Sequence, residues 1–383
     1  MCFPISHELS RLTQVIQLDP KRAEAYYERG QIRGGPEGRQ DLDKAIQLKP
    51  NFTDAYARRG VMRQSDRDDF RGALKDFDRA IQLNPNDAWV YLWRSSVRYR
   101  LGDRQGALVD ETKAVQIEPT AKTFNSRASF REGRGDKVGA IQDWTAAIAL
   151  NPEDTWSYYF RALLYEDTKN YSAALADIDR LRRIKQKNPD NVYPDVAGTY
   201  TWQARIRAQM GNSQPEIADY TQAIQLQPTK TSHYFNRAES RRKVNDDAGA
   251  IADYTQVLQL EPCNFLAYQS RADLRAALKD YSRAIADYSQ AIKFVPQSQW
   301  LASTLYLQRG KAHAELKQYQ AAIADYSQAI QNNPKWKAAY LARATALEQL
   351  GEVSKAKGDR QKAASLPEGQ NTGEIIYGSS PQC

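Results

Sequence analysis

The chain has 383 residues, of which 41% are hydrophobic and 26% are charged, as in an ordinary soluble chain. Its 54 Lys and Arg against 46 Asp and Glu give a net charge of +8. This excess is spread along the chain, which does not favour nucleic acid as a partner. No run of about 18 apolar residues occurs, so no membrane span is predicted. Three cysteines at wide spacing are too few for a disulfide framework and fit no zinc site.

Prolines recur along the chain at intervals of 30 to 39 residues. They are Pro20, Pro50, Pro85, Pro119, Pro152, Pro189, Pro228, Pro262, Pro296, Pro334 and Pro367. Most close a similar phrase, such as AIQLKP (45–50), AIQLNP (80–85) or AIALNP (147–152). Proline lacks an N–H and disfavours helix in the residue before it, so each phrase predicts a helix end. The recurrence of a similar phrase at similar intervals indicates a repeated unit.

Each interval contains two segments of about 12–14 residues whose apolar residues recur at helical spacing. Gly, Asn or Asp separates the two segments, as at Gly102-Asp103, Gly135-Asp136 and Asn245-Asp246. These residue types tolerate the left-handed conformation that ends a helix. The pattern therefore predicts a succession of helix pairs.

The spacing of large and small residues resembles the tetratricopeptide repeat family. Its 34-residue phrase has a bulky residue at repeat position 4, small ones at 8, 20 and 27, a bulky or aromatic one at 24 and proline at 32. Counting back from Pro334, the matching residues are Tyr306, Gly310, Ala322, Tyr326 and Ala329. The resemblance covers residues 1–367. It implies an all-α fold, a right-handed superhelical α-solenoid of antiparallel helix pairs.

In chain order, residues 1–20 are expected to form half a repeat, a second helix alone (8–20) that caps the array. Two alternatives explain the missing first helix: the half repeat pairs with that of a second copy in a homodimer, or the true start of the protein lies further upstream. Repeats one to five are expected in 21–189 and repeats six to ten in 190–367. The inserted residues at 181–197 form either a joint between these halves or a longer loop with continuous stacking. The polar residues 368–383 are expected to be flexible. No secretory signal is visible, so a cytoplasmic location is predicted.

Two charged positions recur with the repeat. Position 7, usually aliphatic in the family, is Arg in nine of ten repeats, and position 23 is Asp in all ten. Since both neighbour packing positions, we expect a ladder of partly buried Arg–Asp pairs that joins first helices to second helices. An anion-binding face is the alternative for the arginines. The residues are Arg29, Arg59, Arg94, Arg127, Arg161, Arg237, Arg271, Arg309 and Arg343, with Asp41, Asp76, Asp110, Asp143, Asp177, Asp219, Asp253, Asp287, Asp325 and Asp359.

The family resemblance implies a concave groove lined by positions 2, 5, 9, 12 and 13 of the first helices, with 6 at its margin. Mapped onto this chain, repeats three to seven place aromatic residues there with Arg and Lys beside them, which are types that dominate interfaces. The candidate partner-binding residues are Trp89, Leu92, Trp93, Tyr99, Arg100, Asn125, Trp156, Tyr159, Phe160, Trp202, Arg205, Phe235, Asn236, Arg242 and Lys243. An interior role for the aromatics, filling gaps between helices, is the alternative.

No catalytic, cofactor-binding or metal-ligating motif is found, so no enzymatic activity, cofactor or metal is predicted. We expect a non-catalytic scaffold or adaptor that binds a peptide or protein segment with apolar anchors and some negative charge. An RNA-binding helical repeat is the first alternative, since groove aromatics can stack on bases. A self-assembling assembly factor is the second. The sequence does not identify the partner.

Overall fold

The computed structural model describes residues 3–65, 69–187, 194–296 and 298–366. Within these ranges every regular element is a helix, which confirms the predicted all-α solenoid of helix pairs. None of the described helices is long and apolar enough to cross a membrane. The chain divides into two compact units, Met1–Ile184 and Lys185–Cys383, and this boundary falls inside 181–197. The tail expected at 368–383 lies outside the described residues.

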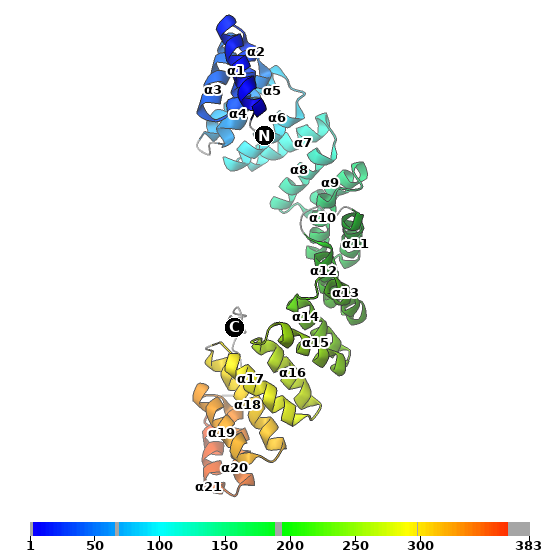
Figure 1. Ribbon diagram of the computed structural model, residues 1–383, viewed down its shortest axis with the longest axis vertical. Coiled ribbons are helices and arrows are strands. Elements are labelled where there is room, and N and C mark those ends of the chain that lie inside the picture. The colour runs from blue at the N-terminus through cyan, green and yellow to red at the C-terminus, as the bar shows by residue number, and fades with distance from the viewer. Residues whose placement is uncertain (1–2, 66–68, 188–193, 297, 367–383) are drawn as a thin grey trace. The chain divides into compact units, whose positions relative to one another are not determined.

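Unit 1 contains the helices α1 (Phe3–Leu18), α2 (Ala23–Arg33), α3 (Gly35–Leu48), α4 (Thr53–Ser65), α5 (Phe70–Leu83), α6 (Ala88–Arg100), α7 (Arg104–Ile117), α8 (Ala121–Gly133), α9 (Lys137–Leu150), α10 (Thr155–Asp167) and most of α11 (Tyr171–Lys187). Its first helix begins at Phe3, earlier than the expected residue 8. From α2 onward, even-numbered helices are the first helices of the repeats and odd-numbered ones the second helices. Figure 1 shows the pairs following one another from blue to green.

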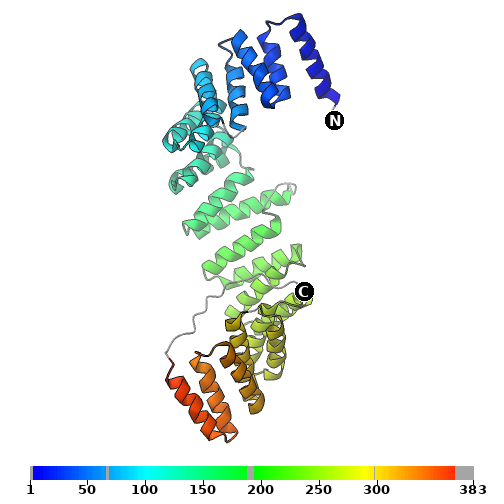
Figure 2. The same cartoon turned by 90° about the vertical axis from the view of Figure 1, so that its left-hand side faces the viewer.

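Unit 2 contains α12 (Val196–Gln209), α13 (Ser213–Leu226), α14 (Thr231–Lys243), α15 (Asp247–Leu260), α16 (Phe265–Ala277), α17 (Tyr281–Phe294), α18 (Gln299–Glu315), α19 (Tyr319–Asn332), α20 (Lys337–Gln349) and α21 (Val353–Ala364). As in unit 1, each first helix packs on the second helix of its own repeat. Each second helix then packs on the first helix of the next repeat. Figure 2 shows the same helices from a second direction.

Small residues allow the two helices of a pair to approach closely. In the pair α8–α9, Ala128 and Ala140 are fully buried against Trp144 and form one apolar cluster with it. In the pair α18–α19, a Cβ atom added to Gly310 would lie 2.6 Å from the Tyr326 ring. The aromatic side chain therefore occupies the space that a larger residue would need, as close-packed interiors require.

The turns inside the helix pairs place one residue in the left-handed region. Gly102 has φ 88° there, and Asn245 has φ 58° at the equivalent place. The next residue begins the second helix as an N-cap: Asp103 and Asp246 each accept a hydrogen bond from a backbone N–H three residues on. The short turn sequences thus encode both the end of one helix and the start of the next.

The Gly310→Ala substitution is expected to destabilise unit 2. The added methyl overlaps the Tyr326 ring, and overpacking of this kind costs about 1–3 kcal/mol. The control is Gly358→Ala in the exposed face of α21, where nothing lies within 4 Å of the added atom. That change should stabilise the helix by about 0.5–1 kcal/mol. Thermal and urea unfolding midpoints measure both, and equal shifts would contradict the packing argument.

Glu111 departs from the packing pattern of its repeat. It occupies position 24, where α5 has Phe77 and α9 has Trp144, and it is only 4% exposed. The Ser95 hydroxyl donates to its carboxylate at 2.8 Å. Burial nevertheless dominates and raises the pKa of Glu111 from 4.5 to about 6. The ionised carboxylate therefore weakens unit 1 at neutral pH.

The pH dependence of stability should reveal this group. Since the pKa of Glu111 is higher in the folded chain, the stabilising protonated form is lost as the pH rises through 6. Glu111→Gln, which cannot ionise, should unfold with a free energy about 2 kcal/mol higher than wild type at pH 7. The difference should vanish near pH 4. Urea unfolding of both proteins across this range provides the test, and parallel curves would contradict it.

Candidate functional site

Nine arginine–aspartate pairs join the first and second helices of their own repeats. In each, Nε donates to Oδ2 at 2.7–3.0 Å and Nη2 donates to Oδ1 at 2.5–2.7 Å. The aspartates are at most 8% exposed. The pairs are Arg29–Asp41, Arg59–Asp76, Arg94–Asp110, Arg127–Asp143, Arg161–Asp177, Arg237–Asp253, Arg271–Asp287, Arg309–Asp325 and Arg343–Asp359. This two-point geometry is the strong form of the ion pair.

The third guanidinium nitrogen reaches the preceding repeat. Nη1 of Arg59 and Arg94 donates to Asp43 and Asp78 at 2.6 and 2.8 Å. Six other arginines donate from Nη1 to a hydroxyl at the same repeat position, at 2.8–3.4 Å; the acceptors are Thr13, Thr145, Thr221, Thr255, Ser289 and Ser327. Each such arginine therefore links three helices, its own and two second helices.

The ring at repeat position 4 supports the same guanidinium. In all nine paired repeats the Arg Cζ lies 5.4–5.8 Å from the centre of the Tyr or Phe ring three residues earlier. This is within the range of a cation–π contact. The hydrogen bonds from Arg309 to Asp325 raise the pKa of the guanidinium, so the pair stays charged. The arginines are thus engaged within the structure.

A second arginine contacts the same aspartate, which the sequence reasoning missed. It lies one helical turn after the ladder position, at repeat position 11. Arg63 and Arg131 each approach the shared Oδ2 at 2.9 Å, and Arg275 approaches it at 2.6 Å. In repeat six, where Gln203 replaces the ladder arginine, Arg207 pairs with Asp219 instead. The spacing of four residues between the two arginines is the signal that could have revealed it.

In unit 1 the predicted partner-binding residues separate into packed and exposed groups. Trp93 stacks on Phe77 with ring centres 6.2 Å apart, and Phe160 stacks on Trp144 at 5.7 Å. These two margin residues therefore fill the space between their own first helix and the second helix of the preceding repeat. Leu92 is also half-buried, packed against a core cluster of α6 and α7. The alternative prediction, that groove aromatic residues fill gaps between helices, therefore describes Trp93 and Phe160, and Leu92 is packed inward in the same way.

The exposed side chains, together with the half-buried Trp89, form a surface on α6, α8 and α10. Trp156 is 57% exposed and Tyr99 is 45% exposed. The Lys122 ammonium of α8 lies 3.7 Å from the centre of the Trp89 ring of α6. Arg100 is exposed at the end of α6. We call Trp89, Tyr99, Arg100, Lys122 and Trp156 the aromatic–cationic face of unit 1.

Two further predicted residues of unit 1 are tied to their neighbours. The Asn125 amide donates to Asp154 at 2.6 Å, and its carbonyl accepts from the Ser157 hydroxyl at 2.6 Å. These bonds link α8 to α10, so Asn125 positions these helices. The Tyr159 ring meets Phe160 edge to face, 5.1 Å between centres. Both side chains are half-buried.

Unit 2 presents a different set of groups on its first helices. Trp202 is only 7% exposed, which corrects its expected place in the groove: its repeat position is the one at which Trp93 and Phe160 turn inward. Arg205 is exposed. Arg242 and Lys243 lie 3.4 Å from carboxylate oxygens of Glu239 and Glu216, respectively. Two of the three predicted basic residues of unit 2 therefore already lie beside carboxylates.

Phe235 and Asn236 line a cavity of about 210 Å³ in unit 2. The other lining residues are Thr231 and Ser232 of α14, Val257 of α15, and Asn264 and Leu266 at the start of α16. The cavity therefore lies between two successive first helices, closed from behind by the second helix.

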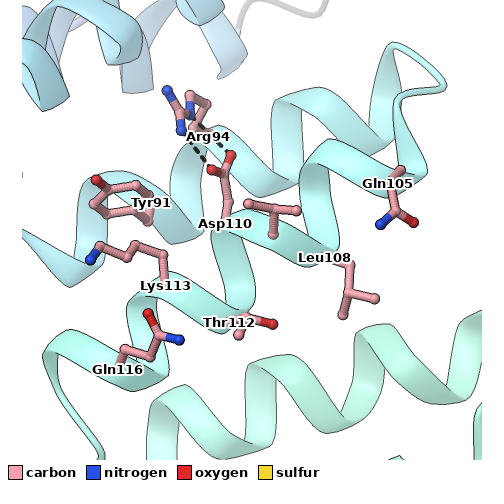
Figure 3. A pocket seen from close by; sticks show the side chains of 9 residues that line it. Tyr91, Arg94, Gln105, Leu108, Asp110, Thr112, Lys113 and Gln116 are labelled. Atoms are coloured by element: carbon pink, nitrogen blue, oxygen red, sulfur yellow. Dashed lines mark hydrogen bonds and ion pairs between the residues drawn. The ribbon is translucent and has the colours of Figure 1, made fainter.

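A larger depression, of about 500 Å³, lies on the pair α6–α7 and contains none of the predicted partner-binding residues. Figure 3 shows the Arg94–Asp110 pair in its wall and Leu108, Thr112 and Lys113 of α7 around it. Val109 adds an aliphatic side chain that is 56% exposed. No cluster of potential metal ligands is found in the described part of the chain.

Family models match three stretches of the chain. Sequence models of the family described as "Tetratricopeptide repeat" match residues 131–189, 235–299 and 303–336. No curated protein matches the sequence. The matched stretches lie within the part of the chain over which the helix pairs recur.

Among solved structures, a tetratricopeptide repeat protein from Parabacteroides merdae is 22% identical, with 67% of this chain and 98% of that chain covered and a TM-score of 0.40. MamA from Desulfovibrio magneticus is 15% identical, with 46% and 97% covered and a TM-score of 0.42. The structure of Naa15/Naa10 bound to HypK-THB gives 14% identity, 94% and 60% coverage and a TM-score of 0.44.

Removal of one ladder arginine tests how deeply the pairs are buried. Arg271→Ala leaves the Asp287 carboxylate buried with a single remaining cation, Arg275. We expect a loss of about 3–5 kcal/mol in unfolding free energy, as for a broken buried pair. The control is Arg283→Ala on α17, whose exposed pair with Asp280 should contribute at most about 1 kcal/mol. Urea unfolding measures both, and a loss as small as the control's would overturn the buried-ladder interpretation.

Proposed function

The chain belongs to the tetratricopeptide repeat family, and from this premise we propose that it is a scaffold that binds a peptide or protein segment along its first helices. Proteins of this family serve as protein–protein interaction scaffolds and are generally non-catalytic. The proposal places the binding residues on the aromatic–cationic face of unit 1, in repeats three to five. A second set lies in repeats six and seven of unit 2.

The observation that supports the proposal most is the exposure of Trp156. A tryptophan that is 57% exposed keeps much of its apolar surface in water, although its ring also contacts Phe160 at 4.5 Å. Phe160 in turn stacks on the buried Trp144, so the exposed ring rests on a rigid aromatic base. Large side chains held in this way act as anchors in interfaces, since little conformational entropy is lost on binding.

The cations of this face favour a partner with negative charge. Lys122 lies over Trp89, and Arg100 is exposed at the end of the same helix as Trp89. The ladder arginines do not contribute, because their carboxylate partners already satisfy them. We therefore propose that the bound segment has apolar side chains beside one or more carboxylates, in agreement with charge complementarity at interfaces.

The experiment is a selection from a displayed random peptide library on the purified full chain. Affinities of the selected peptides are then measured for wild type and for Trp156→Ala. We expect a loss of tenfold or more, or about 1.4 kcal/mol, as for a central interface residue. Val138→Ala is the control, because Val138 is 69% exposed on the second helix α9.

The selected peptides should be enriched in Asp or Glu, and Lys122→Glu should weaken them further by like-charge repulsion. Thermal unfolding of each variant separates loss of binding from loss of folding, since exposed substitutions change stability by only about 0.5 kcal/mol. Equal affinities for wild type and Trp156→Ala would overturn the proposed site in unit 1.

A further inference from the structure

The cavity of unit 2 has the size of a site for one side chain, and its apolar lining consists of Phe235, Val257 and Leu266. Its volume of about 210 Å³ exceeds that of about 150 Å³ at which an apolar protein cavity holds a benzene ring. Phe235 and Leu266 form two walls and are both partly accessible, while Val257 behind them is fully buried. The Phe235 ring contacts Tyr254 at 5.6 Å, so this wall is held in place by the core.

Each first helix that lines the cavity carries a carboxylate further along. Glu239 follows Phe235 by four residues on α14, and Asp273 follows Leu266 by seven residues on α16. Residues at these spacings share a helix face. The carboxylates therefore lie on the side of the helices where the cavity opens.

Buried tyrosines hold both carboxylates from below. The Tyr254 phenol donates to Glu239, and the Tyr288 phenol donates to Asp273 at 2.6 Å. Tyr254 and Tyr288 are 0% and 2% exposed, and burial raises the pKa of both phenols, which keeps them as donors. The carboxylates are thus fixed in position and stay available as acceptors.

Asp273 has only the partial compensation of a nearby charge, that of Arg242. Glu239 has Arg242 at 3.4 Å, but Asp273 makes no ion pair with any described residue. Burial raises the pKa of Asp273 even though the Tyr288 bond and the Arg242 charge oppose this. A carboxylate in this condition gains from a cation supplied by a ligand.

We infer that this subsite of unit 2 binds a segment with one large apolar side chain and a Lys or Arg two or three residues away. The four residues from Phe235 to Glu239 span about 6 Å, and the seven from Leu266 to Asp273 span about 10 Å. An extended chain advances about 3.3 Å per residue, which gives the spacing of two or three.

The inference deepens the proposed function and rests on it, but it concerns the second set of residues, in unit 2, and a ligand of the opposite charge. The aromatic–cationic face of unit 1 favours carboxylates, whereas the subsite of unit 2 favours a cation. An acidic segment that binds unit 1 would bring its carboxylates close to those of the unit 2 subsite, and a basic segment would bring its cation close to those of unit 1. Like charges brought together weaken binding in both cases. The two units would therefore select different sequences.

The test uses fluorescein-labelled synthetic peptides on a Gly-Ser background, with fluorescence anisotropy as the readout. One peptide carries Leu and, three residues later, Lys; the others replace Lys by Gln or Glu, or Leu by Ala. On the full chain we expect the Lys peptide to bind about tenfold more tightly than the Glu peptide and than the Ala peptide. The absence of binding by the Lys peptide, or equal binding of the Lys and Glu peptides, would overturn the inference.

Two variants locate the effect. Leu266→Trp fills the cavity and should remove the preference for Leu over Ala, whereas Leu341→Trp, on the half-exposed face of α20, should leave it unchanged. Asp273→Asn keeps an acceptor for Tyr288 and should remove the preference for Lys over Glu. Glu132→Gln in unit 1 is its control. Preferences that survive both unit 2 variants would overturn the inference.

Trp156→Ala distinguishes this inference from the proposed site in unit 1. If the peptides discriminate at unit 2 while Trp156→Ala leaves the selected acidic peptides unaffected, the site proposed in unit 1 fails and the subsite stands. If Trp156→Ala weakens the acidic peptides while Leu266→Trp and Asp273→Asn change no preference, the subsite fails and the proposed function stands.

Discussion

The guanidinium group at repeat position 7 is the contact on which the arrangement of neighbouring helices depends. Two of its nitrogens bind the buried aspartate of the same repeat, and in eight repeats the third reaches the second helix before it. Apolar packing tolerates small slips between helices, whereas a planar fork with fixed acceptors does not. Buried ion pairs add little net stability, so we interpret the ladder chiefly as a device that fixes register.

This register has a consequence for binding. The core positions carry similar small and large residues in successive repeats, and the ladder positions carry the same pair of charges. The exposed positions of the first helices are therefore free to differ from repeat to repeat without loss of packing. In unit 1 they present Trp156 and the Lys122–Trp89 pair, and in unit 2 a cavity followed by two carboxylates. One fold thus carries two chemically different surfaces, as expected where function lies in sites placed on a common scaffold.

Two residues that depart from the repeat pattern show how a missing or an added charge is compensated. Gln203 stands where the other repeats have arginine, and Arg207 one turn later takes over the aspartate, so the charge remains compensated. Glu111 stands where an aromatic side chain is usual, and its carboxylate stays buried with a raised pKa. The first departure is compensated by a neighbour on the same helix face. The second is compensated only in part, by the Ser95 hydroxyl.

The sequence by itself determined the helix pairs, their turns and the positions of the ladder, because the period of the apolar residues and the prolines reports helix geometry directly. The sequence could not determine which of the aromatic residues that map to the groove are exposed to solvent. Trp156 and Trp202 both map to the groove, yet one is 57% and the other 7% exposed, since burial depends on the helices that pack beside them. The sequence likewise could not predict the third hydrogen bond of the ladder arginines or the tyrosines that donate to Glu239 and Asp273. These contacts join residues 15 to 20 positions apart on different helices, and only the tertiary packing brings them together.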